Sequence, residues 1–186
     1  ETVKSKMAGV ISACAVYYRD NGAAGFADFA RQRLASAGDE ARPLAGGQSL
    51  GPMLNFRLAK PALLVDISRI EELTAVTEDS NGVTVGAAVT HAAIEDGDVG
   101  DVANGLIHHS ASGIAYRAVR NRGTIGGSLA HADPAADWPP VMMALDAEIE
   151  IRGAGGTREV AASDLSTDVM TTVLEPGEVL ALIRIP

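Results

Sequence analysis

Two glycine-rich segments with the same plan restrict the fold of this chain more than any other feature of its sequence. Each holds a glycine pair followed by polar and then apolar residues. The first pair is Gly46-Gly47, and the second, 80 positions later, is Gly126-Gly127. Paired glycines let the backbone turn sharply and let a neighbouring group approach without a Cβ in the way. The pattern of a strand, a tight turn and a helix around the first pair predicts a chain that mixes strands with helices.

Both turns have the chemistry of an anion site. In the first turn the main-chain amides of Gly47, Gln48 and Ser49 would lie at the start of a helix, where unpaired N–H groups favour an anion. We expect the second turn, residues 124–130, to lend its main-chain amides in the same way. Two such turns could hold the two phosphates of a dinucleotide from opposite sides. Paired glycines also mark ordinary turns, so either pair alone is a weak signal.

Charge and cysteine content exclude several classes of protein. The chain has 186 residues, of which 24 are acidic and 15 basic, and its formal net charge is −9. Binding to nucleic acid or to an anionic membrane needs a basic face, so we expect neither partner. A single cysteine, Cys14, allows no disulfide framework and no iron–sulfur cluster held by this chain alone. No apolar run approaches the ~18 residues of a membrane-spanning helix.

The periodicity of apolar residues predicts an α+β chain. Helices are expected over 23–37, 49–58, 101–112 and 134–145, and strands over 42–45, 63–67, 74–77, 83–86, 148–151, 157–161 and 179–185. Asn81-Gly82 predicts a hairpin, and Thr90 predicts a helix N-cap. Asp133, followed by Pro134, predicts the start of the helix over 134–145. We divide the chain into a small α/β subdomain over 1–61 and a larger α+β subdomain over 62–186.

Motif searches leave one enzymatic alternative. The absence of G-x-G-x-x-G argues against a Rossmann site, and Pro52-Met53 stands where a P-loop needs Lys-Ser/Thr. The segment from Gly47 to Gly51 fits G-x-S-x-G, which would make Ser49 the nucleophile of a serine hydrolase. The required chain order would need one acidic residue and one later histidine, taken from Asp66 or Asp96 and from His108, His109 or His131. We rank this hydrolase below the two functional hypotheses that are described in the following paragraphs.

A group of polar residues follows the second turn. His131, Asp133 and Asp137 lie within seven positions, and imidazole with carboxylates can form a metal site. Asp133 is equally suited to cap the following helix. A carboxylate beside a phosphate-binding turn could instead accept hydrogen bonds from ribose hydroxyls. The spacing alone does not choose among these roles.

Longer segments around both turns resemble one family. Residues 42–50, 57–61 and 64–67, then 120–134, and finally 175–178 with 183–186 resemble the flavin subunit of molybdenum hydroxylases. Carbon monoxide dehydrogenase medium subunits and the xanthine dehydrogenase flavin domain belong to that family. The resemblance covers roughly residues 24–186. It implies a two-subdomain FAD-binding fold of the vanillyl-alcohol oxidase type, lacking the family's C-terminal domain.

The resemblance also implies a binding site for FAD. The first turn would wrap the pyrophosphate, the second would contact it from the other subdomain, and Asp137 would bind the adenosine ribose. The residues expected to bind the cofactor are Pro43, Leu44, Ala45, Gly46, Gly47, Gln48, Ser49, Thr124, Gly126, Gly127, Ser128, Asp133 and Asp137. We expect no catalytic side chain and no metal ligand, because the flavin carries the chemistry.

The function implied is that of an oxidoreductase component in the cytoplasm. Electrons would come from an iron–sulfur subunit, supplied by a molybdopterin subunit, and pass through FAD to an external acceptor. Residues 1–23 are atypical of the family's opening strand, and the family continues beyond Pro186. The alternative is a truncated or degenerate relative that acts as an interaction domain and binds no flavin.

Overall fold

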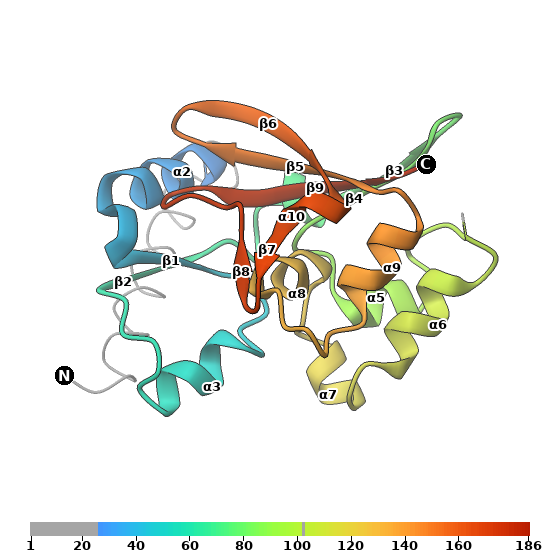
Figure 1. The fold of residues 1–186 in the computed structure, drawn as a ribbon, viewed down its shortest axis with the longest axis horizontal. Helices are drawn as coiled ribbons and strands as arrows, with labels where there is room; N and C mark the ends of the chain where they lie inside the picture. Colours follow the sequence, from blue (N-terminus) through green and yellow to red (C-terminus); the bar gives the residue numbers. More distant parts are fainter. Residues whose placement is uncertain (1–25, 102) are drawn as a thin grey trace.

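The computed structural model describes residues 26–101 and 103–186, so the expectations for residues 1–23 lie outside the described residues. Helices and strands alternate along the first half of the chain (Figure 1). The elements are α2 (Phe26–Ala37), η1 (Gly38–Glu40), β1 (Ala41–Leu44), α3 (Leu50–Asn55), β2 (Leu63–Asp66), α4 (Glu71–Thr74), β3 (Val76–Asp79), β4 (Gly82–Gly86) and α5 (His91–Glu95).

The second half begins with helices and ends with strands. Its elements are α6 (Leu106–Gly113), α7 (Arg117–Arg120), α8 (Ile125–His131), α9 (Trp138–Ala144), β5 (Glu148–Gly153), β6 (Gly156–Ala161), α10 (Ala162–Leu165), β7 (Ser166–Asp168), β8 (Thr171–Thr172) and β9 (Val179–Ile185). The α+β prediction is therefore confirmed for the described part of the chain.

The largest sheet is antiparallel, with the strand order β3-β4-β9-β5-β6. The last strand of the chain, β9, lies at its centre and pairs with β4 and β5. Ile183 faces Val85 on one side and Ile149 on the other. The hairpin predicted at Asn81-Gly82 joins β3 to β4. A side chain at Gly82 would overlap the carbonyl oxygen of Ile185, so the hairpin can lie against the end of β9 only with glycine there.

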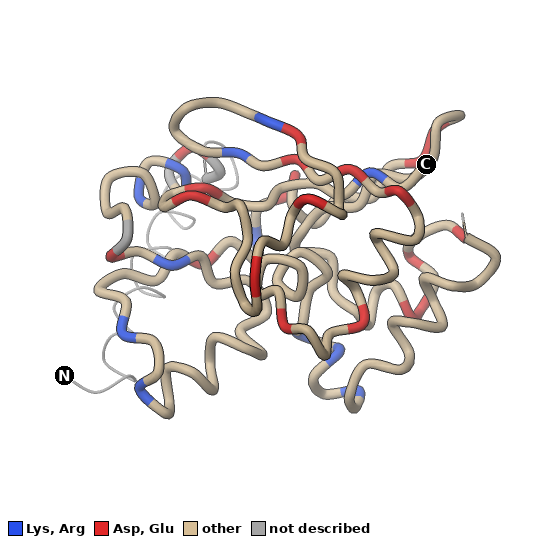
Figure 2. Tube along the Cα trace, in the orientation of Figure 1, with Lys and Arg blue, Asp and Glu red and all other residues tan. Residues whose placement is uncertain are grey.

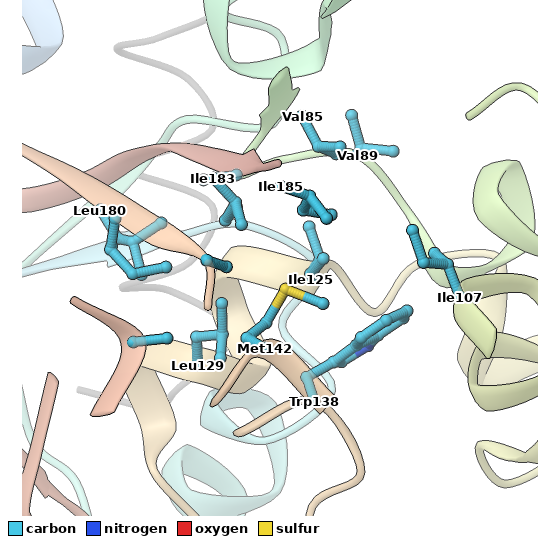
Figure 3. Packing of buried hydrophobic residues seen from close by; sticks show 14 of the residues in the cluster. Val85, Val89, Ile107, Ile125, Leu129, Trp138, Met142, Leu180, Ile183 and Ile185 are labelled. Carbon is cyan, nitrogen blue, oxygen red and sulfur yellow. The ribbon is translucent and has the colours of Figure 1, made fainter. Parts of the chain in front are cut away.

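The main hydrophobic core lies between this sheet and the helices α8 and α9. Trp138 and Met142 of α9 and Ile125 of α8 are fully buried, together with isoleucines of β5 and β9. Figure 3 shows the Met142 and Ile125 side chains between Trp138 and Ile185. The core therefore fixes the start of α8, which is where the second glycine turn lies.

The other face of the sheet carries an ion-pair network. Glu150 points away from the core, since Ile149 and Ile151 on either side of it are core residues, and it accepts hydrogen bonds from Arg152 and Arg184. Blue and red segments lie side by side along β5, β6 and β9 in Figure 2. Burial alone would raise the pKa of Glu150, but the two guanidinium groups lower it on balance. The charges of this face are thus paired with one another.

A second core joins the N-terminal elements to the sheet. It is built from residues of α2, β1, α3, β2 and α4, and it includes Ala88 and Ala181 of the larger sheet region. Strands β1 and β2 pair in parallel, with Leu44 opposite Asp66. The division into two subdomains stays a prediction, and a boundary after residue 61 would separate these two paired strands.

The helix predicted over 134–145 begins later than expected. Asp133 does not cap it: its carboxylate accepts from the amide of Ala135, and its carbonyl accepts from the amide of Ala136, which closes a tight turn. The N-cap position is Asp137, and α9 starts at Trp138. A short acidic side chain accepts a hydrogen bond from a nearby main-chain amide both in a turn and at a helix cap. The sequence therefore could not tell whether Asp133 forms a turn or a cap. The predicted cap at Thr90 is confirmed, because its hydroxyl accepts from the amide of Ala93.

Candidate functional site

The two glycine turns line a single cleft of about 450 Å³. Residues 42–50 form one wall and residues of the segment 123–136 form another, and residues 174 and 178–180 also line the cleft. Of the 13 residues expected to bind a cofactor, 12 line this cleft, and Asp137 is the exception. The structure therefore brings together two segments that lie 80 positions apart in the sequence.

The first turn also touches the segment that leads into the second. A Cβ at Gly46 would overlap the carbonyl oxygen of Arg122 and would lie 2.9 Å from the Cα of Gly123. Gly46 thus packs directly on the backbone that leads into the second turn. The missing side chain at this position makes room for protein backbone, and this contact sets how closely the two walls of the cleft approach.

The first turn offers unpaired main-chain donors. Gly47 has a φ of +71°, a conformation that favours glycine. The amides of residues 46–49 donate to no acceptor within residues 26–101 and 103–186. All four residues line the cleft and are only partly accessible or exposed. Main-chain N–H groups are strong hydrogen-bond donors, so this wall is suited to bind an anion or a carbonyl group.

The second turn differs from the expectation that it lends its amides in the same way. Its N–H groups are already bonded: Ile125 to the Val89 carbonyl, Gly126 to the Ala87 carbonyl, and Gly127 and Ser128 to the hydroxyl and carbonyl oxygens of residue 124. Within residues 124–128 only the amide of Thr124 lacks an acceptor in the described chain. This prediction was wrong because carbonyls of the loop after β4 accept from the amides of Ile125 and Gly126, and Thr124 itself accepts from those of Gly127 and Ser128. What the turn contributes to the lining of the cleft is a small glycine surface, with Thr124 and Ser128 beside it.

Thr124 holds the second turn in shape. Its hydroxyl accepts from the Gly127 amide and caps α8, while its side chain is almost fully buried. We expect Thr124→Val to lower the free energy of unfolding by about 1 kcal/mol, the usual value of an N-cap. Urea unfolding measures this difference. Thr157→Val, at an exposed position of β6, serves as the control, and equal stabilities of the two variants would refute the cap.

An ion-pair cluster fixes the segment before the second turn. Arg120 donates to both carboxylate oxygens of Glu95 and to the carbonyls of Ile114 and Ala115. Arg117 pairs with Glu95 and Asp96. Hydrogen bonding from Arg120 is the main cause that lowers the pKa of Glu95. The cluster ties α7 to α5 and so holds residues 121–124 against the first turn.

A buried histidine lies in the wall of the cleft beside this segment. Nδ1 of His91 accepts a hydrogen bond of 3.0 Å from Nε1–H of Trp138. Burial, and secondarily the charge of Arg120, lowers the pKa of His91 from 6.5 to about 4. The ring is therefore neutral at pH 7 and carries its proton on Nε2. The sequence predicted the helix cap at Thr90 but gave no role to His91, because the hydrogen bond of His91 comes from a tryptophan 47 positions away.

The lowered pKa of His91 makes the stability of the fold depend on pH. Between about pH 6.5 and 4 the unfolded chain takes up a proton that the folded chain does not, so stability is full above 6.5 and falls as the pH approaches 4. From pH ~7 to pH ~5 we expect a loss of about 2 kcal/mol beyond that of the His91→Asn variant. Urea unfolding at both pH values measures it. Equal losses in the two proteins would contradict a neutral, buried His91.

The remaining candidate residues are not assembled into a catalytic or metal site. Asp137 is exposed outside the cleft, whereas Asp133 and His131 line it. Within the described residues no three His, Cys, Asp or Glu side chains form a metal-binding group. The hydrolase array is not formed either: Asp66 accepts from Ser68, and Asp96 pairs with Arg117. Neither carboxylate bonds a histidine in the part of the chain that the structure describes.

The sequence matches a known family over most of its length. Residues 17–186 match the family described as the FAD binding domain in molybdopterin dehydrogenase, and the chain belongs to this family. FAD is therefore the cofactor of the domain to which this chain belongs. The resemblance noted from the two glycine turns is confirmed.

Similar proteins are subunits of oxidoreductases. The chain is 43% identical over 148 residues to the glyceraldehyde dehydrogenase medium chain of Sulfolobus acidocaldarius, covering 80% of this chain and 53% of that protein. It is 41% identical over 153 residues to the carbon monoxide dehydrogenase medium chain of Afipia carboxidovorans, covering 82% and 53%. A chain of quinoline 2-oxidoreductase from Pseudomonas putida 86 superposes with a TM-score of 0.80 at 42% identity, covering 85% and 55%. The chain thus spans about half the length of the curated relatives it matches.

Proposed function

We propose that this chain is the FAD-binding part of a molybdenum-containing hydroxylase or dehydrogenase, and that its cleft holds the diphosphate of FAD between the two glycine turns. The observation that carries this proposal is that both turns line one cleft and that Gly46 of the first touches the segment that leads into the second. The amides of residues 46–49, which have no acceptor in the described chain, form one wall, and a glycine surface held by the α8 cap forms the other; together they suit a diphosphate. FAD, when bound, supplies the electron-transfer chemistry.

The chain's own residues bind and orient the cofactor. The amides of residues 46–49 donate to the diphosphate, and the Thr124 and Ser128 hydroxyls contact it from the opposite wall. Pro43 and Leu44, which line the cleft beside the first turn, pack against the cofactor. Asp133 lines the cleft, and Asp137, proposed to bind the adenosine ribose, is exposed outside it.

The place of the chain in an enzyme is proposed from its relatives. Two of them are named medium chains, and a third is named a subunit of a 6-hydroxypseudooxynicotine dehydrogenase complex. We propose an iron–sulfur subunit as electron donor, a molybdopterin subunit as its source, and an external acceptor. A two-subdomain fold of the vanillyl-alcohol oxidase type and a cytoplasmic location belong to the same proposal. No helix within the described residues combines the length and apolarity needed to cross a membrane.

The test is a visible absorption spectrum of the purified protein, followed by titration with FAD. We expect flavin bands, or saturable quenching of flavin fluorescence at one FAD per chain. A colourless protein that does not quench FAD would favour the interaction domain without flavin. Gly47→Val is not a suitable variant for this test. The positive φ of Gly47 would strain a branched side chain, so a loss of FAD binding could come from a distorted turn.

A further inference from the structure

His91 has a hydrogen-bond donor that the fold does not use. One ring nitrogen, Nδ1, is bonded to Trp138, and the other, Nε2, has no partner within the described residues. The side chain is 95% buried, with a relative exposure of 5%. The Nε2–H group is therefore a donor that remains available to an acceptor from outside the described chain.

The free N–H is open to the cleft. No buried side-chain nitrogen or oxygen lacks a partner among residues 26–101 and 103–186, so Nε2, which has none, keeps some accessible surface. His91 lines the cleft, which is where that surface lies. The bond from Trp138 fixes both the orientation of the ring and the nitrogen that carries the proton.

Nε2 lies where the first turn meets the segment that leads into the second. A Cβ at Gly123 would lie 2.8 Å from Nε2 of His91, and a Cβ at Gly46 would overlap the Arg122 carbonyl oxygen and lie 2.9 Å from the Cα of Gly123. The donor is therefore next to the contact between the walls of the cleft. The amides of residues 46–49 have no acceptor in the described chain on the adjoining wall.

The charged side chains around the cleft leave the binding of an anion mainly to neutral hydrogen-bond donors. The charged side chains that line it are one cation, Arg42, and two carboxylates, Asp133 and Glu178. Glu178 is paired with Arg158. An anion in this cleft must therefore be held mainly by N–H groups without net charge.

We propose that His91 donates a hydrogen bond through Nε2–H to a diphosphate oxygen of FAD. This inference rests on the proposed function and adds to it a ligand-binding residue outside both glycine turns. Trp138 acts through His91 as a positioning residue, because it contacts the imidazole and not the cofactor.

Two substitutions separate the two nitrogens. In His91→Asn the short amide can still accept from Trp138 but has no donor at the position of Nε2. In His91→Gln the longer amide places a donor near Nε2. We expect His91→Asn to raise the Kd of FAD roughly 10- to 100-fold, the effect of a lost hydrogen bond to a charged group, and His91→Gln to recover most of the affinity. His109→Asn, at an exposed histidine of α6, is the control.

ADP serves as the second probe, because it carries the diphosphate without the flavin. The Kd of ADP should rise in His91→Asn as that of FAD does, while riboflavin binding should not change. In wild-type protein labelled with ¹⁵N-histidine, the Nε2 resonance should shift when ADP is added and the Nδ1 resonance should not.

Each outcome has one meaning. Wild-type protein that binds neither FAD nor ADP would overturn the proposed function itself. Wild-type protein that binds both, with equal Kd values for wild type and His91→Asn or no Nε2 shift, would overturn the role of His91 alone. A larger loss in His91→Gln than in His91→Asn would assign His91 only to the support of Trp138.

Discussion

Replacing Gly46 by alanine is expected to raise the Kd of FAD by at least about 100-fold. The added Cβ would overlap the Arg122 carbonyl oxygen, which is a backbone atom that cannot rotate away, so the first turn must move away from the segment before the second. Moving one wall breaks at least two hydrogen bonds to a charged group, which is about 3 kcal/mol or more. Fluorescence titration with FAD measures the effect.

Gly51→Ala is the matched control for this substitution. Gly51 lies in α3, five positions after Gly46, and a Cβ there would meet no atom within 4 Å. Alanine has a higher helix propensity than glycine, so this variant should bind FAD normally and unfold at an equal or higher urea concentration. If Gly46→Ala bound FAD as tightly as Gly51→Ala, the contact of the first turn with the segment before the second would not shape the site.

Replacing Trp138 by alanine is expected to lower the free energy of unfolding by about 3–5 kcal/mol. Trp138 is fully buried and is the first residue of α9, so its removal leaves a large cavity between α9 and the sheet. It also leaves Nδ1 of His91 without its donor. Urea unfolding at pH 7 measures the change.

Met143→Ala is the control on the same helix. Met143 is half exposed on α9, and exposed positions usually change stability by no more than about 0.5 kcal/mol. A loss below about 1 kcal/mol in Trp138→Ala would mean that the core closes without the indole. The cleft wall at His91 would then not depend on this core.

The longer helices and strands followed from the sequence because each depends on local signals, whereas the short helices α4, α7, α8 and α10 and the strands β7 and β8 were not predicted. The Asn81-Gly82 hairpin and the Thr90 cap use residues adjacent in the chain, and the structure contains both. The two glycine turns were identified for the same reason. Their convergence on one cleft followed from the family resemblance, since the segments lie 80 positions apart.

Parts of the site that depend on distant partners could not be predicted in this way. The amide of Gly126 bonds the carbonyl of Ala87, and a Cβ at Gly126 would overlap the Ala87 side chain. That glycine serves packing as well as any ligand. Asp133 and Asp137 have the same chemistry in the sequence, and only the late start of α9 places one in the cleft and the other outside it.

The central claim is that one diphosphate lies between the two glycine turns, and a crystal structure of the protein with FAD tests it most directly. The account predicts diphosphate oxygens at about 3 Å from main-chain nitrogens of residues 46–49, with the opposite side of the diphosphate against Thr124 and Gly127. A diphosphate bound outside the cleft, or in contact with only one of the two turns, would contradict it.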